Sequence, residues 1–300
     1  MSAAPAGIDR ALPRVHAIHH TNIEQPLLGL DASLEERADW IADEICSQLA
    51  DVLPEHPDGQ WQHVLCTTSL STLLSGDRAF CSRLFDRIER ERGVRPLGLL
   101  QQYQCTGWGF GMRFAGGQAQ ARRLAMTVVD VDVHDAIARG FSDAIGRVGF
   151  GVTTIALELG SAPVLPDCAG PFANRAFSDL AHAVRALHKR SGRQRTFMPF
   201  LPEGLAELAE RLIGQDILAP NRYERYGHCF GSDPWIGLIE WIGREAPEEE
   251  TGATLGSFAY DGYYAAANVV VGPYTAVSLS RFGAADGIHC KSTEIARWPS

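Results

Sequence analysis

The sequence predicts a layered α/β protein built from two similar halves. Segments with the composition of β-strands alternate with segments that have the apolar spacing of helices, the usual pattern of layered α/β folds. The strand–helix–strand order of the first half is found again in the second half, although no strong sequence repeat accompanies it. The 300 residues are 45% hydrophobic and 21% charged, which provides enough apolar material for a large core.

The first half begins with an amphipathic segment over 34–53. Leu34, Ala38, Ile41 and Ile45 recur there at helical spacing, so this segment is predicted to be a helix. The other elements expected in this half follow in order: a strand over 61–69, a helix over 73–92, a strand over 96–104, a helix rich in small residues over 106–123 and a Val-rich strand over 124–133.

The second half is predicted to alternate in the same way and to end on a pair of strands. Two segments, 26–31 and 161–172, have the composition of loops. The expected elements of the second half are a strand over 195–200, a helix over 204–214, a helix over 233–245 and two closing strands within 252–262 and 263–282.

The charge of the chain argues against two classes of partner. The net charge is −9 and the sequence pI is about 5.6. A nucleic-acid-binding face or an anionic membrane would call for a basic surplus, so neither partner is expected. No segment reaches the roughly 18 apolar residues of a membrane span, and residues 1–20 lack the apolar centre of a signal peptide. These features predict a cytoplasmic protein.

The seven cysteines are scattered and odd in number, and no two form a CxxC pair. This pattern predicts neither a disulfide framework nor a structural zinc site. Most of these thiols are therefore expected to be buried as small apolar groups.

Cys105 is distinguished by its position between a predicted strand and a predicted helix. The unpaired N–H groups at a helix start favour a thiolate, which is the nucleophilic form of cysteine. Gly107, Gly109 and Gly111 would weaken an ordinary helix, so close packing against other backbone is expected there. The competing interpretation is a buried, inert thiol.

Four segments, in this order, resemble the ketosynthase III branch of the thiolase superfamily. The likeness runs from about residue 35 to the end and is carried by LCTTSL (65–70), QCTGWGFGMRFAGG (104–117), IGRVGFGVTTIALELG (145–160) and YGHCFGSDPWIGLIEW (226–241) with the strands after it. The resemblance implies a thiolase-like five-layer α-β-α-β-α fold. It also implies two pseudo-repeated halves, 1–165 with the nucleophile and 166–300 with the histidine.

The resemblance assigns Cys105 as the nucleophile that carries an acyl group as a thioester. His228 stands where the ketosynthases have Asn and where thiolases have His, which makes it the candidate base; an ordinary loop histidine is the alternative. Phe200 stands where the ketosynthase histidine is expected, and Phe200 and Trp108 are assigned to the substrate pocket. Cys229 is interpreted as a packing residue, with a second, thiolase-like thiol as the alternative.

The loop at 259–262 matches the glycine-rich loop of the family. The resemblance implies that a backbone N–H of this loop joins the N–H of Cys105 in binding the oxyanion of the acyl group. Tyr260 and Asp261 replace glycines in this loop. Asp261 is open to two interpretations, an acid or base and, preferred here, a residue that shapes the turn.

Three other polar clusters are interpreted as structural. Residues 130–135, DVDVHD, would place Asp130, Asp132 and His134 on one face of a strand, but a solvated strand end including Asp135 is expected rather than a metal site. The pair His19 and His20 and the run at 247–250 are expected in loops or on the surface.

These features predict an acyltransferase or condensing enzyme of a specialised biosynthetic pathway. No cofactor and no metal are expected. The acyl donor is an acyl carrier protein or acyl-CoA thioester; the carrier protein is preferred because the short N-terminal region lacks the adenine-binding Trp and Arg of the family. A homodimer is expected, built around the strand after the helix of Cys105 or a neighbouring strand. The alternative function is a non-catalytic or weakly catalytic partner subunit.

Overall fold

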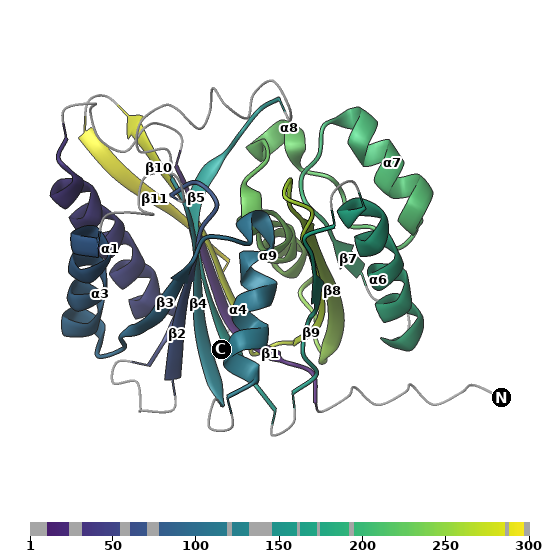
Figure 1. Ribbon diagram of the computed structural model, residues 1–300, viewed down its shortest axis with the longest axis horizontal. Helices are drawn as coiled ribbons and strands as arrows, with labels where there is room; N and C mark the ends of the chain where they lie inside the picture. The colour runs from purple at the N-terminus through teal and green to yellow at the C-terminus, as the bar shows by residue number, and fades with distance from the viewer. Residues whose placement is uncertain are drawn as a thin grey trace.

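The computed structural model describes ten stretches of the chain. These are residues 11–23, 32–54, 61–70, 78–118, 122–131, 146–160, 163–172, 175–191, 195–285 and 288–296. Helices and sheet alternate across the molecule in five layers, as Figure 1 shows. No helix within these stretches is long and apolar enough to cross a membrane.

The larger helices form the two outer layers and the central one (Figure 1). One outer layer holds α1 and α3, the central layer holds α4 and α9, and the other outer layer holds α6 and α7. Their bounds are Leu34–Val52 for α1, Arg78–Arg92 for α3, Gly107–Gly116 for α4, Ala176–Ser191 for α6, Glu203–Ile213 for α7 and Asp233–Glu245 for α9. Two short helical turns and α8 (Tyr223–Tyr226) lie in the loops, the turns being η1 (Gln104–Thr106) and η2 (Phe230–Ser232).

The strands that separate these layers are joined by hydrogen bonds in the order β3-β2-β4-β5-β1-β9-β8-β7. A hairpin of β10 and β11 adds to β1, and the short β6 pairs with β9. The bounds are Arg14–Ile23 for β1, Trp61–Cys66 for β2, Pro96–Leu100 for β3, Arg123–Asp130 for β4, Phe150–Glu158 for β5, Asp167–Ala169 for β6, Arg195–Phe197 for β7, Thr251–Phe258 for β8, Tyr264–Val271 for β9, Ala276–Ala285 for β10 and Ile288–Ala296 for β11.

Three apolar clusters hold the five layers together. The largest surrounds Trp108 of α4 and Trp235 of α9, whose rings meet edge to face at 5.7 Å between the two parts of the sheet. A second cluster packs α1 and α3 against the outer face of β2, β4 and β5, and a third packs α6 and α7 against β8 and β9. Each helix layer is thus fixed by burial of its own apolar stripe.

Most of the predicted elements are present, with different ends. The helix expected over 34–53 is α1, the one expected over 204–214 is α7, and the one expected over 233–245 is α9 with the same bounds. The helix predicted over 106–123 ends at Gly116, and the strand predicted over 96–104 ends at Leu100. The loop expected over 26–31 lies outside the described residues.

Several elements differ from the sequence-based expectations. The strands β1, β5 and β11 and the helix α6 were not predicted, and β6 lies within the predicted loop 161–172. The closing strand predicted within 263–282 is two strands, β9 and β10. The placement of His19 and His20 on the surface is wrong, because both are buried in β1, which lies between β5 and β10. Their polar rings are accommodated because β10 and β5 supply hydroxyl partners, Ser280 to His19 and Thr153 to His20.

The two pseudo-repeated halves that the resemblance implies do not contain matching sets of strands. The first part of the sheet, from β3 to β1, has five strands and is extended by β10 and β11. β4 has neighbours on both sides, β2 and β5, and so it offers no edge to a second chain. β3 is the end of that part of the sheet.

Candidate active site

Cys105 lies at the point where β3 leads into the central helix. The turn η1 carries the thiol and continues directly into α4, and the side chain is buried with 7% of the residue exposed. The predicted strand–cysteine–helix arrangement is therefore present. The thiol faces the segment that precedes α9 in the second half of the chain.

A histidine and an aspartate line up behind this thiol. The Nε2 of His228 lies 3.6 Å from the Cys105 sulfur, and its Nδ1 lies 2.6 Å from Oδ2 of Asp233. Asp233 is the first residue of α9 and is fully buried. Sulfur, imidazole and carboxylate thus form a continuous chain with the geometry of a nucleophile, base and orienting acid.

Backbone groups fix the orientation of the imidazole. Asp233 accepts the N–H of Phe200 at 2.9 Å and the N–H of Cys229 at 2.7 Å, which holds the carboxylate in place. The Nδ1 of His228 also lies 3.2 Å from the carbonyl oxygen of Phe200. Since Nδ1 faces two acceptors, it carries the hydrogen, and the lone pair of a neutral ring at Nε2 points to Cys105.

The electrostatics of the buried pair favour a protonated imidazole. Burial opposes the charge on His228, but the carboxylate of Asp233 and the sulfur of Cys105 outweigh it and raise the pKa of His228 well above its usual value. A histidine with these neighbours takes up the thiol proton readily. His228 is therefore placed to act as a base toward the Cys105 thiol.

A buried carboxylate supports the other side of the thiol. The hydroxyl of Thr68 lies 4.0 Å from the Cys105 sulfur, and Asp130 accepts the N–H of Thr68 at 2.6 Å and that of Ser69 at 3.0 Å. Burial raises the pKa of Asp130 to about 6, against the N–H groups of Ser69, Thr68 and Gly231, which lower it. Asp130 thus links the loop after β2 to the turn η2.

The solvated strand end predicted for Asp130 is wrong, because its carboxyl is fully buried and is surrounded by backbone donors. Asp132, His134 and Asp135 lie outside the described residues. In the stretches that the structure describes, no group of three histidine, cysteine or acidic side chains is arranged to hold a metal ion.

Close backbone packing explains two glycines around the nucleophile. A Cβ on Gly109 would lie 2.5 Å from the Cβ of Ala265, so α4 could not approach β9 with any other residue there. A Cβ on Gly231 would lie 3.3 Å from the carbonyl oxygen of Cys105, which keeps η2 against η1. The glycines thus allow the two halves to meet at the thiol, as the sequence predicted for α4.

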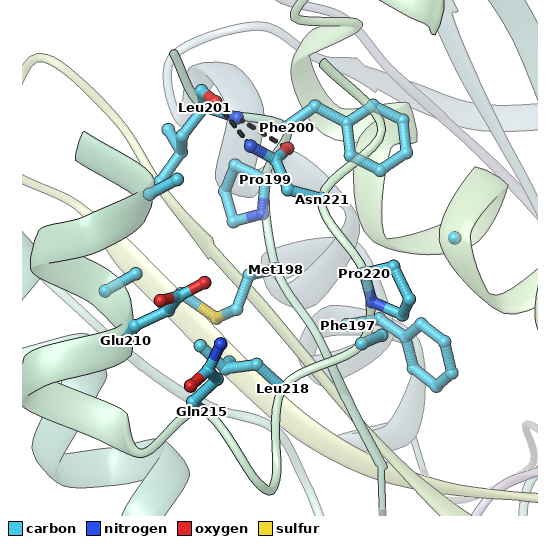
Figure 2. A pocket seen from close by; sticks show the side chains of 14 residues that line it. Phe197, Met198, Pro199, Phe200, Leu201, Glu210, Gln215, Leu218, Pro220 and Asn221 are labelled. Atoms are coloured by element: carbon cyan, nitrogen blue, oxygen red, sulfur yellow. Dashed lines mark hydrogen bonds between the residues drawn. The ribbon is translucent and has the colours of Figure 1, made fainter. Parts of the chain in front are cut away.

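Phe200 contributes to the site mainly through its backbone. Its ring is buried and stacks on Tyr226 at 5.8 Å between centroids. Phe200 also lines a cavity of about 240 Å³ beside α7, shown in Figure 2. There Asn221 holds Leu201 by two hydrogen bonds, one donated to the carbonyl oxygen at 2.6 Å and one accepted from the N–H at 3.2 Å.

Trp108 lies in the core between the two parts of the sheet. Its indole N–H donates to the hydroxyl of Ser257 at 2.8 Å, and its ring packs on Trp235. Trp108 is fully buried. Trp108 therefore packs in the core through its contacts with Ser257 and Trp235.

Tyr260 and Asp261 occupy the tip of the hairpin between β8 and β9. Tyr260 is exposed, whereas Asp261 accepts a hydrogen bond from the side chain of Gln104 at 2.8 Å. The N–H groups of Ala259 and Gly262 are engaged within the turn, with Tyr263 and Ala259 as acceptors. The hairpin tip thus reaches the residue directly before the nucleophile.

Cys229 follows His228 directly in the sequence, and its thiol is buried. Its sulfur lies 3.6 Å from the carbonyl oxygen of Tyr226, and burial, with the carboxylates of Asp233 and Asp130 nearby, raises the pKa of Cys229 well above its usual value. These surroundings favour the neutral thiol, as expected for a packing residue.

The sequence matches no family model and no curated protein. Similarity appears among solved structures: FabH, the 3-oxoacyl-(acyl carrier protein) synthase III of Pseudomonas aeruginosa PAO1, is 13% identical with a TM-score of 0.59 over 87% of this chain and 98% of that chain. The tetronic acid condensing enzyme AbyA1 is 13% identical with a TM-score of 0.58 over 87% and 100% of the two chains. ChlB3, labelled an aceyltransferase, is 13% identical with a TM-score of 0.61 over 87% and 98%.

This chain has the thiolase-like fold of the ketosynthase III enzymes. The predicted fold class is therefore confirmed.

Asp233, Thr68 and Asp130 are the residues of this candidate site whose roles the sequence did not reveal. An aspartate at the first position of a helix is common for reasons of capping and dipole, so Asp233 carried no separate signal. Asp130 and Thr68 belong to segments that are 61 or more residues apart and meet only through pairing of β2 and β4. A carboxylate within a Val-rich strand was the available signal for Asp130.

Proposed function

We propose that this protein transfers acyl groups through a thioester on Cys105, as an acyltransferase or condensing enzyme of the ketosynthase III type. The observation that carries this proposal is the chain from the Cys105 sulfur through His228 to Asp233. Nucleophile and base are within reach of each other, and the base is oriented by a buried carboxylate. The fold, which is that of enzymes named for condensation and acyl transfer, supports the same class of reaction.

In the first step, Nε2 of His228 takes the proton of the Cys105 thiol, and the sulfur attacks the carbonyl carbon of an acyl thioester. The carbon–sulfur bond to the donor breaks, the donor thiolate takes the proton from His228, and the acyl group remains on Cys105. The proposed donors for the intervening oxyanion are the N–H of Cys105 and one N–H of the loop at 259–262.

In the second step, an acceptor attacks the acyl carbon and the Cys105 sulfur leaves. The buried His228–Asp233 pair supports an alcohol or amine acceptor, because such an acceptor must lose a proton to a base. A malonyl-type acceptor instead generates its carbanion by losing carbon dioxide, and Phe200 stands where the ketosynthases place a histidine. We therefore favour acyl transfer to oxygen or nitrogen over carbon–carbon bond formation.

The proposal extends to the assembly and the carrier. We propose that 1–165 supplies the nucleophile and 166–300 the base, as two halves of one site. The proposed homodimer forms through β3, the end strand of its part of the sheet, and the proposed donor is an acyl carrier protein. Sedimentation at micromolar concentration tests the dimer, and loading rates of one acyl group from the two carriers test the donor.

The experiment that tests the function is intact-protein mass spectrometry after incubation with acetyl-CoA and, separately, with an acetylated carrier protein. The wild type is expected to gain one acyl group, and Cys105→Ala to gain none and to lose all turnover. Cys229→Ala is the matched control, since it removes a neighbouring buried thiol. An adduct that persists in Cys105→Ala, or a wild type that never loads, contradicts the proposal and favours a non-catalytic partner subunit.

A further inference from the structure

Gln104, the residue directly before Cys105, has a left-handed backbone conformation with a φ of 46°. Residues other than glycine adopt this region only when their surroundings hold them there, and such residues are concentrated at functional sites. Gln104 also begins η1, the turn that aims the thiol. Whatever holds Gln104 therefore helps to fix the direction of Cys105.

The tip of the β8–β9 hairpin reaches this residue. The side-chain amide of Gln104 donates to Oδ2 of Asp261 at 2.8 Å, a hydrogen bond with a charged acceptor. Asp261 lies in the connection between β8 and β9, residues 259–263, in which Gly262 has a left-handed φ of 84°.

Three further contacts support this tip. The ring of Tyr263, the residue after Gly262, meets the ring of Tyr103 edge to face at 5.4 Å and that of Phe110 at 5.8 Å. The N–H of Phe172 donates to the carbonyl oxygen of Gly262 at 2.8 Å. The hairpin is thus packed on two rings that stack on each other, Tyr103 before Cys105 in the sequence and Phe110 after it.

We propose that Asp261 is a positioning residue that holds Gln104 in its left-handed conformation and thereby aims Cys105 at His228. The proposal rests on the function proposed above and gives Asp261 no contact with the reacting atoms. If the hydrogen bond is lost, Gln104 relaxes toward negative φ and the peptide between Gln104 and Cys105 rotates. The thiol then turns away from Nε2 of His228, and the N–H of Cys105 turns with it.

The test compares five variants of the full-length protein: Asp261→Ala, Asp261→Asn, Gln104→Ala, Gln104→Gly and the double variant Gln104→Gly/Asp261→Ala. Two rates are measured, alkylation of Cys105 by iodoacetamide, followed at its own peptide by mass spectrometry, and acyl transfer. Alkylation needs no acyl substrate, so it reports on the thiol even if the proposed function fails.

Asp261→Ala and Gln104→Ala are each expected to slow both reactions about tenfold, with a fall in kcat and little change in KM. Asp261→Asn keeps an oxygen acceptor for Gln104 and is expected to recover most of the rate. Glycine adopts positive φ at no steric cost, so Gln104→Gly should make Asp261 dispensable, and the double variant should match Gln104→Gly within about twofold.

Glu207→Ala, which removes an exposed carboxylate from α7, is the matched control and should leave both rates unchanged. A double variant as slow as Asp261→Ala would overturn the proposal, because Asp261 would then act without Gln104. Unchanged rates in Asp261→Ala would overturn it as well. If Asp261→Ala does not fold, Gln104→Ala and Asp261→Asn are compared instead. Slow alkylation of Cys105 in Gln104→Ala with near-normal alkylation in Asp261→Asn supports the proposal. Equal alkylation rates in these two variants contradict it.

Discussion

The loop that carries His228 and the strands that carry His20 and His63 bury their imidazoles to a similar depth, with 7%, 0% and 0% of these residues exposed. The pKa values of the three imidazoles are nevertheless shifted in different directions. Burial, joined at His20 by the neighbouring His19, lowers the pKa of His20 to about 3, and burial alone lowers the pKa of His63 to about 3. At His228 the pKa is raised well above the usual value.

The pKa shifts differ because each imidazole contacts a different kind of group. His63 meets the hydroxyl of Thr127 at 3.0 Å and His20 meets that of Thr153 at 2.7 Å, and a neutral hydroxyl does not stabilise an imidazolium. His228 meets the carboxylate of Asp233 at 2.6 Å, which outweighs the cost of burying the charge. His228 thus differs from His20 and His63 in having the buried carboxylate of Asp233 on one side and the thiol of Cys105 on the other, and these two neighbours make it the candidate base.

The largest effect that this comparison predicts is the loss of the base. His228→Ala should slow acyl transfer by roughly 10²–10⁴-fold, the usual value of general acid–base help, because the acceptor then has no group to take its proton. Covalent loading of Cys105 should fall less than transfer, because His228 assists loading by taking the thiol proton, but a thiol, unlike an alcohol acceptor, also loses its proton to solvent at ordinary pH. Single-turnover loading and transfer rates, measured separately, check this expectation.

His63→Gln is the matched control for His228→Ala, because it alters an equally buried imidazole that faces a hydroxyl. It should leave transfer within about threefold of the wild type, as expected for a residue away from the reaction. Full turnover in His228→Ala, or equal losses in the two variants, would contradict the assigned role.

The second prediction removes the charge that distinguishes His228 from the other two. Asp233→Asn should slow transfer by about 10²-fold, less than loss of the base itself, because the orienting acid of a triad contributes less than its base. It should also lower the pKa of His228 toward the values of His20 and His63, since burial then acts without an opposing charge. An NMR titration of the His228 ring measures this directly, and an unchanged titration would refute the assigned role of Asp233.

The third prediction concerns stability in acid. His20 and His63 have folded pKa values of about 3, below the ordinary 6.5, so the unfolded chain binds more protons below pH 6.5 and stability falls as the pH falls toward 3. At pH 5 each of these histidines should cost about 2 kcal/mol of unfolding free energy relative to neutral pH. His228 acts in the opposite sense: its contribution is present below pH 6.5 and is lost as the pH rises through its raised folded pKa.

Urea unfolding at pH 7 and pH 5 measures the effect. His63→Gln should lose about 2 kcal/mol less than the wild type between these values, since one proton-binding group of the unfolded state is gone. Equal losses in His63→Gln and the wild type would show that His63 is not buried in its neutral form.

The comparison also shows which parts of the site a sequence can reveal. Cys105 and His228 were identified because each lies in a segment that resembles the ketosynthase III branch, and Cys105 also precedes a predicted helix. Asp233 was not, because its approach to His228 depends on a backbone reversal in which Gly227 has a φ of 73° and Phe230 a φ of 53°. Backbone angles of this kind leave no periodic pattern in the residues between them.

The misplacement of His19 and His20 has a related cause. The segment HAIHHTN has the composition of an exposed stretch, and it becomes a buried strand only because Ser280 and Thr153 lie opposite it. These partners are 261 and 133 residues away along the chain. Local propensity predicted the amphipathic helices well, whereas β1 depends on long-range pairing that one sequence does not show.

The smallest effect is expected at Phe200, where the site uses the backbone and not the ring. The N–H of Phe200 donates to Asp233 and its carbonyl oxygen faces His228, so both contacts survive a change of side chain. Phe200→Leu keeps an apolar group against Tyr226 and should cost about 1 kcal/mol of unfolding free energy, as for other apolar exchanges in a core. Transfer should fall less than about threefold, far below the loss in Asp233→Asn. Thermal unfolding and steady-state transfer measured on the same preparation check both values. A loss near 10²-fold with normal stability would mean that the Phe200 ring itself contacts the acyl group, which would give the side chain the pocket role that the sequence predicted for it.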